Sequence, residues 1–592
     1  MNDNKNLVLA VVFSVVILLS YEFYASWRYP PVPLEDQAIS EGQSIGQAAT
    51  VPSVPTSSAS GDVQIPSLAG SSQATVAVPV SSEVLRQQAR EVLAKSPRVT
   101  IEGDRVHGSL SLRGGRIDDL TLSDYRETLD DSSPPIVLLS PSGTKGAYFT
   151  EYGWVGNGIS VPNENTLWKA STTTLRSDRP VTLRWDNGEG LTFERIITID
   201  ENYMFSITQR VINKGTAPVT LHPYGLISRH GTPNVSTLYI LHEGLLGVFD
   251  GTLQEVDYDD LREDKNVITN TTTGGWLGIT DKYWLVALVP DQKTSVTTNF
   301  GYRKSGDLDK YQADFLGAAV AIAPGTSGEV VSHLFTGAKE VKKLDAYEEA
   351  FGIARFDLAI DFGWFYFLTK PIFYTLIWIE ERVGNFGIAI LLLTVLIKLL
   401  FFPLANKSYK AMSKMKKLQP EMVKLRERFA DDKMALNKEM MALYKREKAN
   451  PAAGCLPMVV QIPVFFSLYK VLYVTIEMRQ APFFGWIQDL SIPDPTNVFE
   501  LFGLIEWGAA DVLPQAVLIG FWPLLMGLTM FLQQRLNPPP ADPTQAKIFM
   551  FLPILFTFML ARFPAGLVIY WAWNNSLSIL QQKTIMYRMG VK

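Results

Sequence analysis

The sequence predicts a polytopic α-helical membrane domain that follows a large, all-β, extracytoplasmic sandwich domain. Its 592 residues are 47% hydrophobic with a mean hydropathy of +0.08, too apolar for an ordinary soluble protein and too polar for a chain buried wholly in membrane. Large apolar residues crowd the chain after residue 352, and short runs of alternating apolar and polar residues fill much of the part before it. The average therefore hides two different domains.

Charge and motifs exclude several functional classes. The net charge of −5 is small for this length and gives no reason to expect a nucleic-acid partner. Cys455 is the only cysteine, which excludes an internal disulfide and a cysteine-based zinc cluster. The five histidines show no metal-binding spacing, and the chain has no phosphate-binding loop, nucleophile elbow or dinucleotide fingerprint. We expect neither an enzyme nor a bound metal or cofactor.

Residues 1–29 are expected to form a signal-anchor span. Lys5 precedes an apolar run from Leu7 to Tyr21, which is typical of either a cleaved signal or an uncleaved anchor. A cleaved signal needs small residues at its end, whereas this run ends in YEFYASW, an aromatic border typical of a membrane interface. We favour the anchor.

Residues 30–97 are expected to be a flexible linker. No Phe, Tyr or Trp occurs from Pro30 to Asp124, and no Lys or Arg from Asp36 to Val80. Such a composition buries too little apolar area to order the chain. A short helix is expected only at 82–95.

Residues 98–345 are expected to form a large antiparallel β-sandwich. Runs such as VTLRW at 181–185 and LTFERIITI at 191–199 alternate, and Asn187-Gly188 between them is a turn signal. Tryptophans such as Trp154, Trp276 and Trp284 either line a cleft or belong to the core.

Residues 346–384 are expected to connect the two domains. Residues 340–351 predict a connecting helix, and 361–384 predict an aromatic, amphipathic helix lying along the membrane interface and broken by Pro371.

Residues 385–592 are expected to be the membrane domain. Apolar runs at 386–404, 453–476, 515–534, 546–562 and 565–583 bring the total to six spans. The segment between Lys407 and Lys448 has 13 basic and six acidic residues, a net charge of +7, which places it in the cytoplasm. Both termini are then cytoplasmic, and the loop 478–513 and the β domain lie outside.

The basic segment at 406–450 is expected to be a helical hairpin. Its helical pattern breaks near Asp431 and Asp432, either of which can cap a second helix. The hairpin either is a solvated loop that only fixes topology or offers an adaptable apolar surface, because six methionines lie among its charges.

Lys398 is the one charged residue in the predicted span 386–404. A lysine at the centre of a transmembrane helix costs about 2.5–3.5 kcal/mol, so it requires compensation or a function. If the side chain of Lys398 reached along the helix to the interface beyond Leu404, it would have to bridge about 9 Å. We therefore favour the alternative, in which Lys398 faces a hydrated cavity within the helix bundle. Thr394 lies one turn earlier on the same face. No acidic residue lies deep in a span, so the cation implies water and a visiting anionic group. Other polar groups at membrane depth are more often contacts between helices.

Several segments together resemble the YidC/Oxa family of membrane protein insertases, in the Gram-negative YidC type with a large periplasmic domain. They cover nearly all of residues 355–585 in the family's order and include IDFGWFYFLTKPIF, VGNFGIAILLLTVLIK, MMALYKREKANPAAGCLPMVVQIPVFFSLY, MRQAPFFGWIQDLSIPDP and FPAGLVIYWAWNN. The anchor, linker and β domain match the family in architecture.

The resemblance implies a five-helix core around a hydrophilic groove with one positive residue. Lys398 stands at that position, where bacterial relatives commonly have arginine. Thr394 and Trp571 match groove positions associated with substrate contact, although many relatives have tyrosine in place of Trp571. The expected substrate-contacting residues are Lys398, Thr394, Gln461, Gln533, Tyr570 and Trp571.

The resemblance also implies partners and a location. An inner-membrane insertase and chaperone would insert nascent membrane proteins and help them fold and assemble, alone or with the Sec translocon and its accessory subunits, in contact with the lipid bilayer. The ribosome is a further expected partner. Candidate docking residues in the hairpin are Lys414, Lys416, Lys417, Arg426 and Arg428.

Two other functions remain open. A solute transporter would use Lys398 as the counter-charge of an anion, although no internal repeat is visible. The β domain would alternatively be a carbohydrate-binding module or enzyme on a membrane anchor, since large sandwiches commonly carry such sites.

Overall fold

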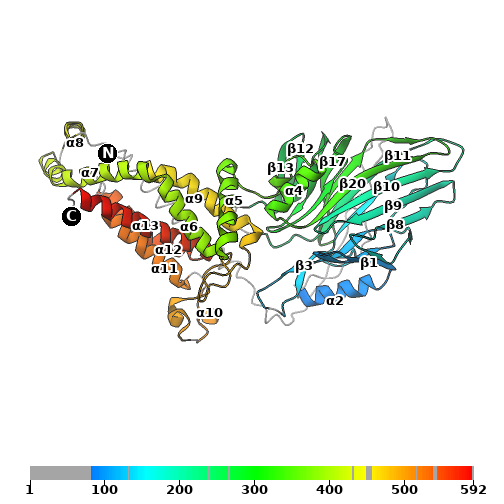
Figure 1. Ribbon diagram of the computed structural model, residues 1–592, viewed down its shortest axis with the longest axis horizontal. Coiled ribbons are helices and arrows are strands. Elements are labelled where there is room, and N and C mark those ends of the chain that lie inside the picture. Colours follow the sequence, from blue (N-terminus) through cyan, green and yellow to red (C-terminus); the bar gives the residue numbers. More distant parts are fainter. Residues whose placement is uncertain are drawn as a thin grey trace, which may run out of the picture. The chain divides into compact units, whose positions relative to one another are not determined.

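The structure is a computed structural model, and its elements are labelled in Figure 1. It describes residues 82–589 except 131, 236–240, 265–266, 430–431, 448–455, 506, 515–516 and 538–542. The expected anchor at 1–29 and the expected linker up to residue 81 lie outside the described residues, as do the last residues of the predicted hairpin.

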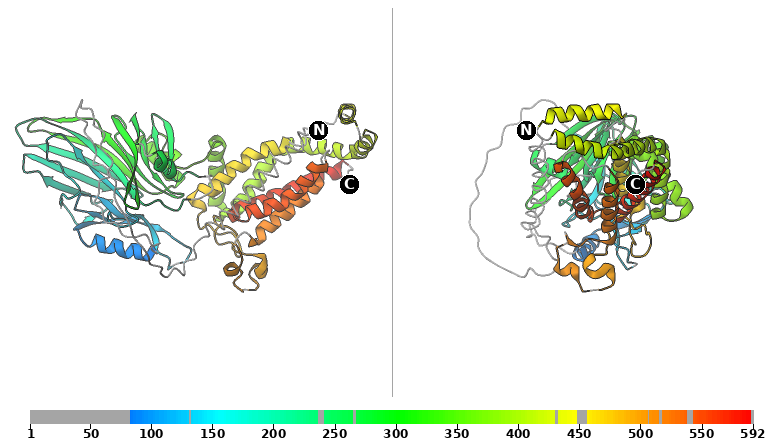
Figure 2. Two further views of the ribbon diagram at one scale, coloured as in Figure 1. Left: turned by 180° about the vertical axis from the view of Figure 1, so that it is seen from behind. Right: turned by 90° about the vertical axis from the view of Figure 1, so that its left-hand side faces the viewer.

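Two layered β-sheets form the first part of the described chain, as the alternating pattern predicts (Figures 1 and 2). The eleven-stranded sheet runs in the order β14 (Ile268–Thr273), β17 (Ser295–Ser305), β18 (Leu308–Gly317), β11 (Val219–His230), β5 (Tyr148–Val155), β3 (Ile117–Arg126), β2 (Val106–Ser111), β1 (Arg98–Glu102) and β7 (Thr174–Leu175), with β19 (Val320–Ile322) on β11 and β4 (Pro135–Leu139) on β3. The nine-stranded sheet runs in the order β13 (Thr252–Asp257), β12 (Gly244–Phe249), β15 (Trp276–Thr280), β16 (Trp284–Val289), β20 (Ser327–Ala338), β10 (Met204–Asn213), β9 (Leu191–Ile199), β8 (Val181–Asp186) and β6 (Lys169–Ala170). Among the described strand pairs only β1 with β7 is parallel.

The local sequence explains these strands. Alternate side chains of β10 are buried, and the strand pairs in register with β9 from Phe205 opposite Ile199 onward. At the β8–β9 turn, Gly188 adopts a φ of +74°, and the Asn187 side chain accepts the amide hydrogens of two residues beyond it. The predicted turn is confirmed.

The two sheets share one core. Arg195 of β9 is buried and donates to the carbonyl oxygens of Gly115, at 2.6 Å, and of Tyr152 in β5, and burial lowers the pKa of its guanidinium. Trp154 and Trp276 are buried in this core and Trp284 packs partly buried against it. The structure therefore supports the core interpretation of these tryptophans over a cleft.

Helices dominate the rest of the described chain, and α2 (Ser82–Leu93) lies where the sequence indicates a short helix. After α3 (Tyr258–Asp264) in the β domain come α4 (Val341–Phe351), the short η1 (Phe356–Ala359), α5 (Tyr366–Val383), α6 (Phe386–Leu400), α7 (Phe402–Arg428), α8 (Lys433–Arg446), α9 (Leu456–Val474), η3 (Ile476–Met478), η4 (Val498–Gly503), α10 (Ala509–Val512), α11 (Phe521–Leu536), α12 (Pro543–Leu560) and α13 (Ala565–Arg588). The helix α4 confirms the connecting helix predicted at 340–351.

Two helix predictions need correction. Pro371 does not break α5, which runs through it, because a proline early in a helix removes a single hydrogen bond while buried Ile372 and Leu376 hold the helix against the protein. The span predicted to begin at 515 begins as helix only at Phe521, since Gly520 is the N-cap and Asp494 accepts the amide hydrogen of Trp522 at 2.9 Å.

Within the described residues no single helix combines the length and apolarity needed to cross a bilayer. The helices α6 and α7 meet that criterion only together, as a pair bent by 68°.

Candidate functional site

A sharp bend separates α6 from α7 and sets the position of Lys398. The helix α6 ends at Leu400, because Pro403 in the first turn of α7 lacks an amide hydrogen and its ring conflicts with the carbonyl group four residues earlier. The predicted span 386–404 is thus too long by one turn. Lys398 lies in the last turn of α6, where the partial negative charge of the helix end favours a cation.

Lys398 has a neutral partner. Its Nζ donates a hydrogen bond of 2.8 Å to Oγ of Ser578 on α13, and that hydroxyl donates to the carbonyl oxygen of Asn574 at 2.8 Å. In the part of the chain that the structure describes, the salt bridges formed by lysines do not include Lys398. The half-buried ammonium group therefore keeps most of its capacity to bind an anion.

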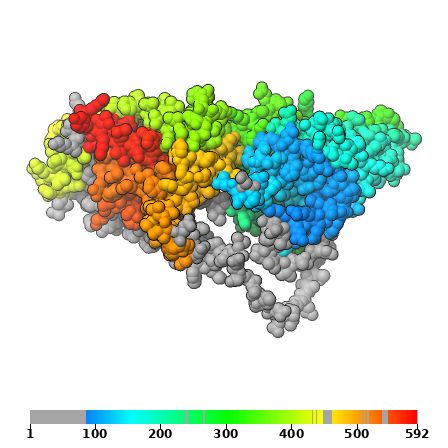
Figure 3. Space-filling view, turned by 60° about the horizontal axis from the view of Figure 1, so that its bottom comes forward, coloured from blue at the N-terminus to red at the C-terminus, as the bar shows by residue number. Residues whose placement is uncertain are grey.

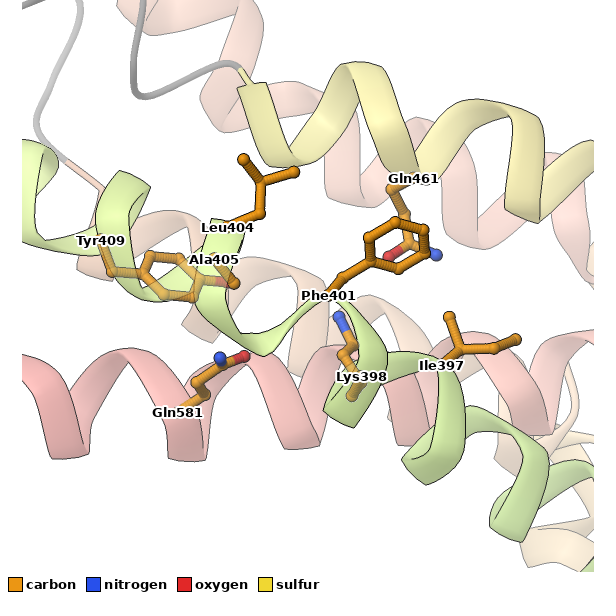
Figure 4. Close-up of a pocket in the computed structure, with 8 residues that line it drawn as sticks. All are labelled: Ile397, Lys398, Phe401, Leu404, Ala405, Tyr409, Gln461 and Gln581. Carbon is orange, nitrogen blue, oxygen red and sulfur yellow. The ribbon is translucent and has the colours of Figure 1, made fainter.

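A cavity of about 40 Å³ opens beside Lys398 between α6, α7, α9 and α13 (Figure 4). This volume holds about two or three water molecules. Lys398 and Gln461 come from facing helices and point toward one another, and Lys398 is the only charged residue of the lining (Figure 4). The lining consists of Ile397, Lys398, Phe401, Leu404, Ala405, Tyr409, Gln461 and Gln581.

Gln581 contributes an uncharged amide side chain to the lining of this cavity. Its amide nitrogen is buried and has no hydrogen-bond partner among the described residues. A buried donor of this kind gains free energy when an acceptor reaches it. Lys398 is the charged donor that the lining presents to the cavity, which therefore suits a carboxylate or a peptide carbonyl group.

The predicted groove residues divide into two sets. Lys398 and Gln461 line the cavity, and Gln461 Nε2 donates to the hydroxyl of Tyr570 at 2.9 Å, so Tyr570 lies behind the lining. Thr394 is buried and donates to the carbonyl oxygen of Ile390 in its own helix at 2.7 Å.

The other two predicted residues also lie away from the cavity lining. The ring of Trp571 packs against Phe465 and Phe556, with centroid distances of 4.6 Å and 5.9 Å. Gln533 is half-buried on α11. Both belong to the helix bundle, and neither contributes to the lining.

Sequence reasoning missed Ser578, Gln581 and Tyr409. Ser578 and Gln581 follow Asn574 at intervals of four and three residues, so a search for a polar face on α13 finds them. Tyr409, on α7, is buried and lines the cavity. No sequence signal indicates that Tyr409 reaches this cavity, because its position depends on the bend between α6 and α7.

The predicted hairpin is present as α7 and α8. Asp432 caps α8 by accepting the amide hydrogens of Met434 and Ala435 at 3.0 Å, which confirms the capping role. Met422 and Met440 are buried between the two helices, whereas Met434 is exposed. All five candidate docking residues lie on α7: Lys414, Lys417 and Arg428 are exposed, and Lys416 and Arg426 are half-buried.

Known proteins match the chain over its whole length. The family model of the YidC periplasmic domain matches residues 98–375, and that of the 60Kd inner membrane protein matches residues 378–592. The membrane protein insertase YidC of Methylobacterium nodulans is 49% identical over 605 residues, covering 100% of this chain and 96% of the relative. The chain belongs to the YidC family of membrane protein insertases. The YidC of Bradyrhizobium diazoefficiens is 50% identical over 613 residues, covering 100% of this chain and 97% of that relative.

Among solved structures, that of an active YidC insertase with its first transmembrane domain resolved matches with a TM-score of 0.32 and 16% identity, covering 84% of this chain and 97% of that one. Membership of the YidC family confirms the resemblance found in the sequence, and these comparisons support neither the solute-transporter nor the carbohydrate-binding hypothesis. The protein is an inner-membrane insertase, and the β domain is its periplasmic domain.

Proposed function

We propose that the cavity beside Lys398 receives the polar flank of a membrane segment while that segment is being inserted. The observation that carries this proposal is the pairing of Lys398 with a single neutral hydroxyl, next to the unpaired amide of Gln581. A carboxylate in the flank gains a charge-assisted hydrogen bond that Ser578 does not supply.

The insertion step uses the same physics. Polar backbone crossing bare hydrocarbon costs several kcal/mol for each unsatisfied group, and a wet cavity with a cationic donor lowers that cost. The apolar part of the segment moves into lipid, and its burial drives the step.

We extend the proposal to topology and partners. Six spans, a cytoplasmic hairpin and two cytoplasmic termini agree with the distribution of basic residues. The exposed Phe367 and Trp378 of α5, with exposed Trp364 just before it, suit a helix lying at the membrane interface. The exposed basic residues of α7 suit a nascent chain or the ribosome, and the protein acts alone or with the Sec translocon and its accessory subunits.

Reconstitution tests the proposal directly. The purified protein in liposomes is expected to insert a single-span nascent protein that carries two aspartates in its translocated flank, scored by protease protection. A hydrogen bond to a charged group contributes about 1.5–3 kcal/mol, so Lys398→Ala should slow insertion about tenfold or more. A substrate with a neutral flank should be affected less.

Lys342→Ala is the matched control, because Lys342 is an exposed lysine paired with Glu381 and lies outside the cavity. Equal insertion of the acidic substrate by wild type and Lys398→Ala would contradict the role of Lys398.

A further inference from the structure

The periplasmic loop between α9 and α11 is apolar on its outside. Leu504 is 84% exposed and Val512 is 71% exposed. The part that carries α10 forms a lobe standing off from α11–α13, and it is seen in orange in Figures 1 and 3. Soluble surfaces rarely expose so many large apolar side chains together. The exposed set includes Phe484, Trp486, Leu504, Ile505, Trp507 and Val512.

The carboxylate of Asp494 in this lobe is turned inward. Asp494 accepts hydrogen bonds from the amide of Thr496 at 3.0 Å, the amide of Trp522 at 2.9 Å and Nε1 of Trp486 at 3.2 Å. Its charge therefore satisfies the lobe's own donors and leaves an aromatic ring on the surface.

The carboxylate of Glu500 is also turned toward donors of the lobe. Glu500 accepts from the side-chain amide of Asn497 at 2.6 Å and from the backbone amide of Ala509 at 2.8 Å. Trp507 Nε1 donates to the carbonyl oxygen of Phe499 at 2.9 Å, so its polar atom is also satisfied within the lobe. Among its described side chains, the lobe is polar inside and apolar outside, the reverse of a part built to face water.

The connection of the loop to α9 and α11 and its lack of basic residues indicate what covers this surface. The loop joins α9 to α11, two helices that the proposed function places in the membrane, so both of its ends lie at the bilayer surface. No lysine or arginine occurs between Gln480 and Gln534, so the lobe has no cation for an acidic partner or an anionic headgroup. Tryptophan and phenylalanine with satisfied polar atoms are the side chains enriched at the edge of the hydrocarbon.

We infer that the lobe from Phe484 to Val512 is embedded in the periplasmic leaflet as a lipid-binding surface. It anchors the ends of α9 and α11 at a fixed depth in the bilayer. The inference rests on the proposed function only for the placement of α9 and α11 in the membrane.

Fluorescence quenching in vesicles tests this inference. A full-length Cys455→Ser variant, first shown to insert substrate like wild type, receives one cysteine at position 504, 512, 528 or 267, labelled with an environment-sensitive dye. The vesicles contain phosphatidylcholine and phosphatidylglycerol, with either spin-labelled lipid or aqueous iodide as quencher. Leu528, an exposed residue of α11, reports membrane placement, and exposed Val267 of the β domain reports water.

The inference predicts that lipid quenches the dye at 504, 512 and 528, whereas iodide quenches it at 267. Quenching by lipid at 528 and by iodide at 504 and 512 overturns the inference and leaves the membrane placement intact. Shielding of 504 and 512 from both quenchers also overturns it, because a protein partner or second copy then covers the lobe. Iodide quenching at 528 contradicts the membrane placement itself.

Discussion

Two lysines, one in the β domain and one in the helical domain, each donate a hydrogen bond to a hydroxyl group but differ in how far they are enclosed. Lys339, directly after β20, donates to the hydroxyl of Thr280 at 2.8 Å, and Lys398 donates to the hydroxyl of Ser578 at 2.8 Å. Lys339 is only 2% exposed, whereas Lys398 borders a cavity. Acidic side chains act on Lys339 from several directions: Asp281, Glu243, Asp361 and Glu255.

The difference teaches that burial alone does not mark a functional lysine. Lys339 is enclosed by the β domain, so no visiting group reaches it, and the carboxylates that act on it only partly offset the cost of its burial. Neither lysine forms a salt bridge in the described chain, but Lys398 has open space beside it and Lys339 has none. A buried charge left without its counter-charge next to open space is the better candidate for binding substrate.

The largest expected effect is on stability and concerns Lys339. Burial lowers the pKa of Lys339 to about 8 from its ordinary 10.5. The unfolded state therefore binds more protons between pH 8 and 10.5, so stability should rise as the pH increases through this window. Below pH 8 the cost of the buried charge is about 3 kcal/mol. Lys339→Met should raise the melting temperature at pH 7 and flatten its rise above pH 8.

Lys342→Met, which changes an exposed lysine, is the control for this measurement. Substrate insertion by Lys339→Met should match wild type in liposomes at 25 °C. If Lys339→Met inserted acidic-flank substrates as poorly as Lys398→Ala, the distinction between a structural and a substrate-binding lysine would be wrong.

A smaller effect is expected from the partner of Lys398. Ser578→Ala removes the hydroxyl that holds the ammonium group at the cavity, and one such hydrogen bond contributes about 1 kcal/mol, so insertion of the acidic substrate should slow about threefold to fivefold. Ser576→Ala is the matched control, because the Ser576 hydroxyl donates to the carbonyl oxygen of Ala572 in its own helix and no bond from it to Lys398 occurs among the described residues. Equal rates for the two variants would show that Ser578 does not position Lys398.

The sequence predicted the structure best where a local pattern, such as alternating hydrophobicity or a turn dipeptide, determines the conformation. Alternation of apolar residues predicted the two sheets, the Asn187-Gly188 signal predicted a turn, and hydropathy singled out Lys398. Each of these depends on residues close together in the chain.

Contacts between distant segments were out of reach of the sequence pattern. The sequence pattern did not predict the 68° bend between α6 and α7, and it joined Thr394 to the site of Lys398, whereas the Thr394 hydroxyl bonds within its own helix. Pairing with Ser578 joins residues 180 positions apart. A hydropathy profile measures the cost of a buried charge, and it does not show which distant side chain meets that charge.

Charge reversal tests the central claim most directly. Insertion rates in liposomes are measured for wild type and Lys398→Glu, each with one single-span substrate whose flank carries either two aspartates or two lysines. If Lys398 is a transient counter-charge, wild type favours the aspartate flank and Lys398→Glu favours the lysine flank. An unchanged preference, or an equal loss for both substrates, would contradict the account.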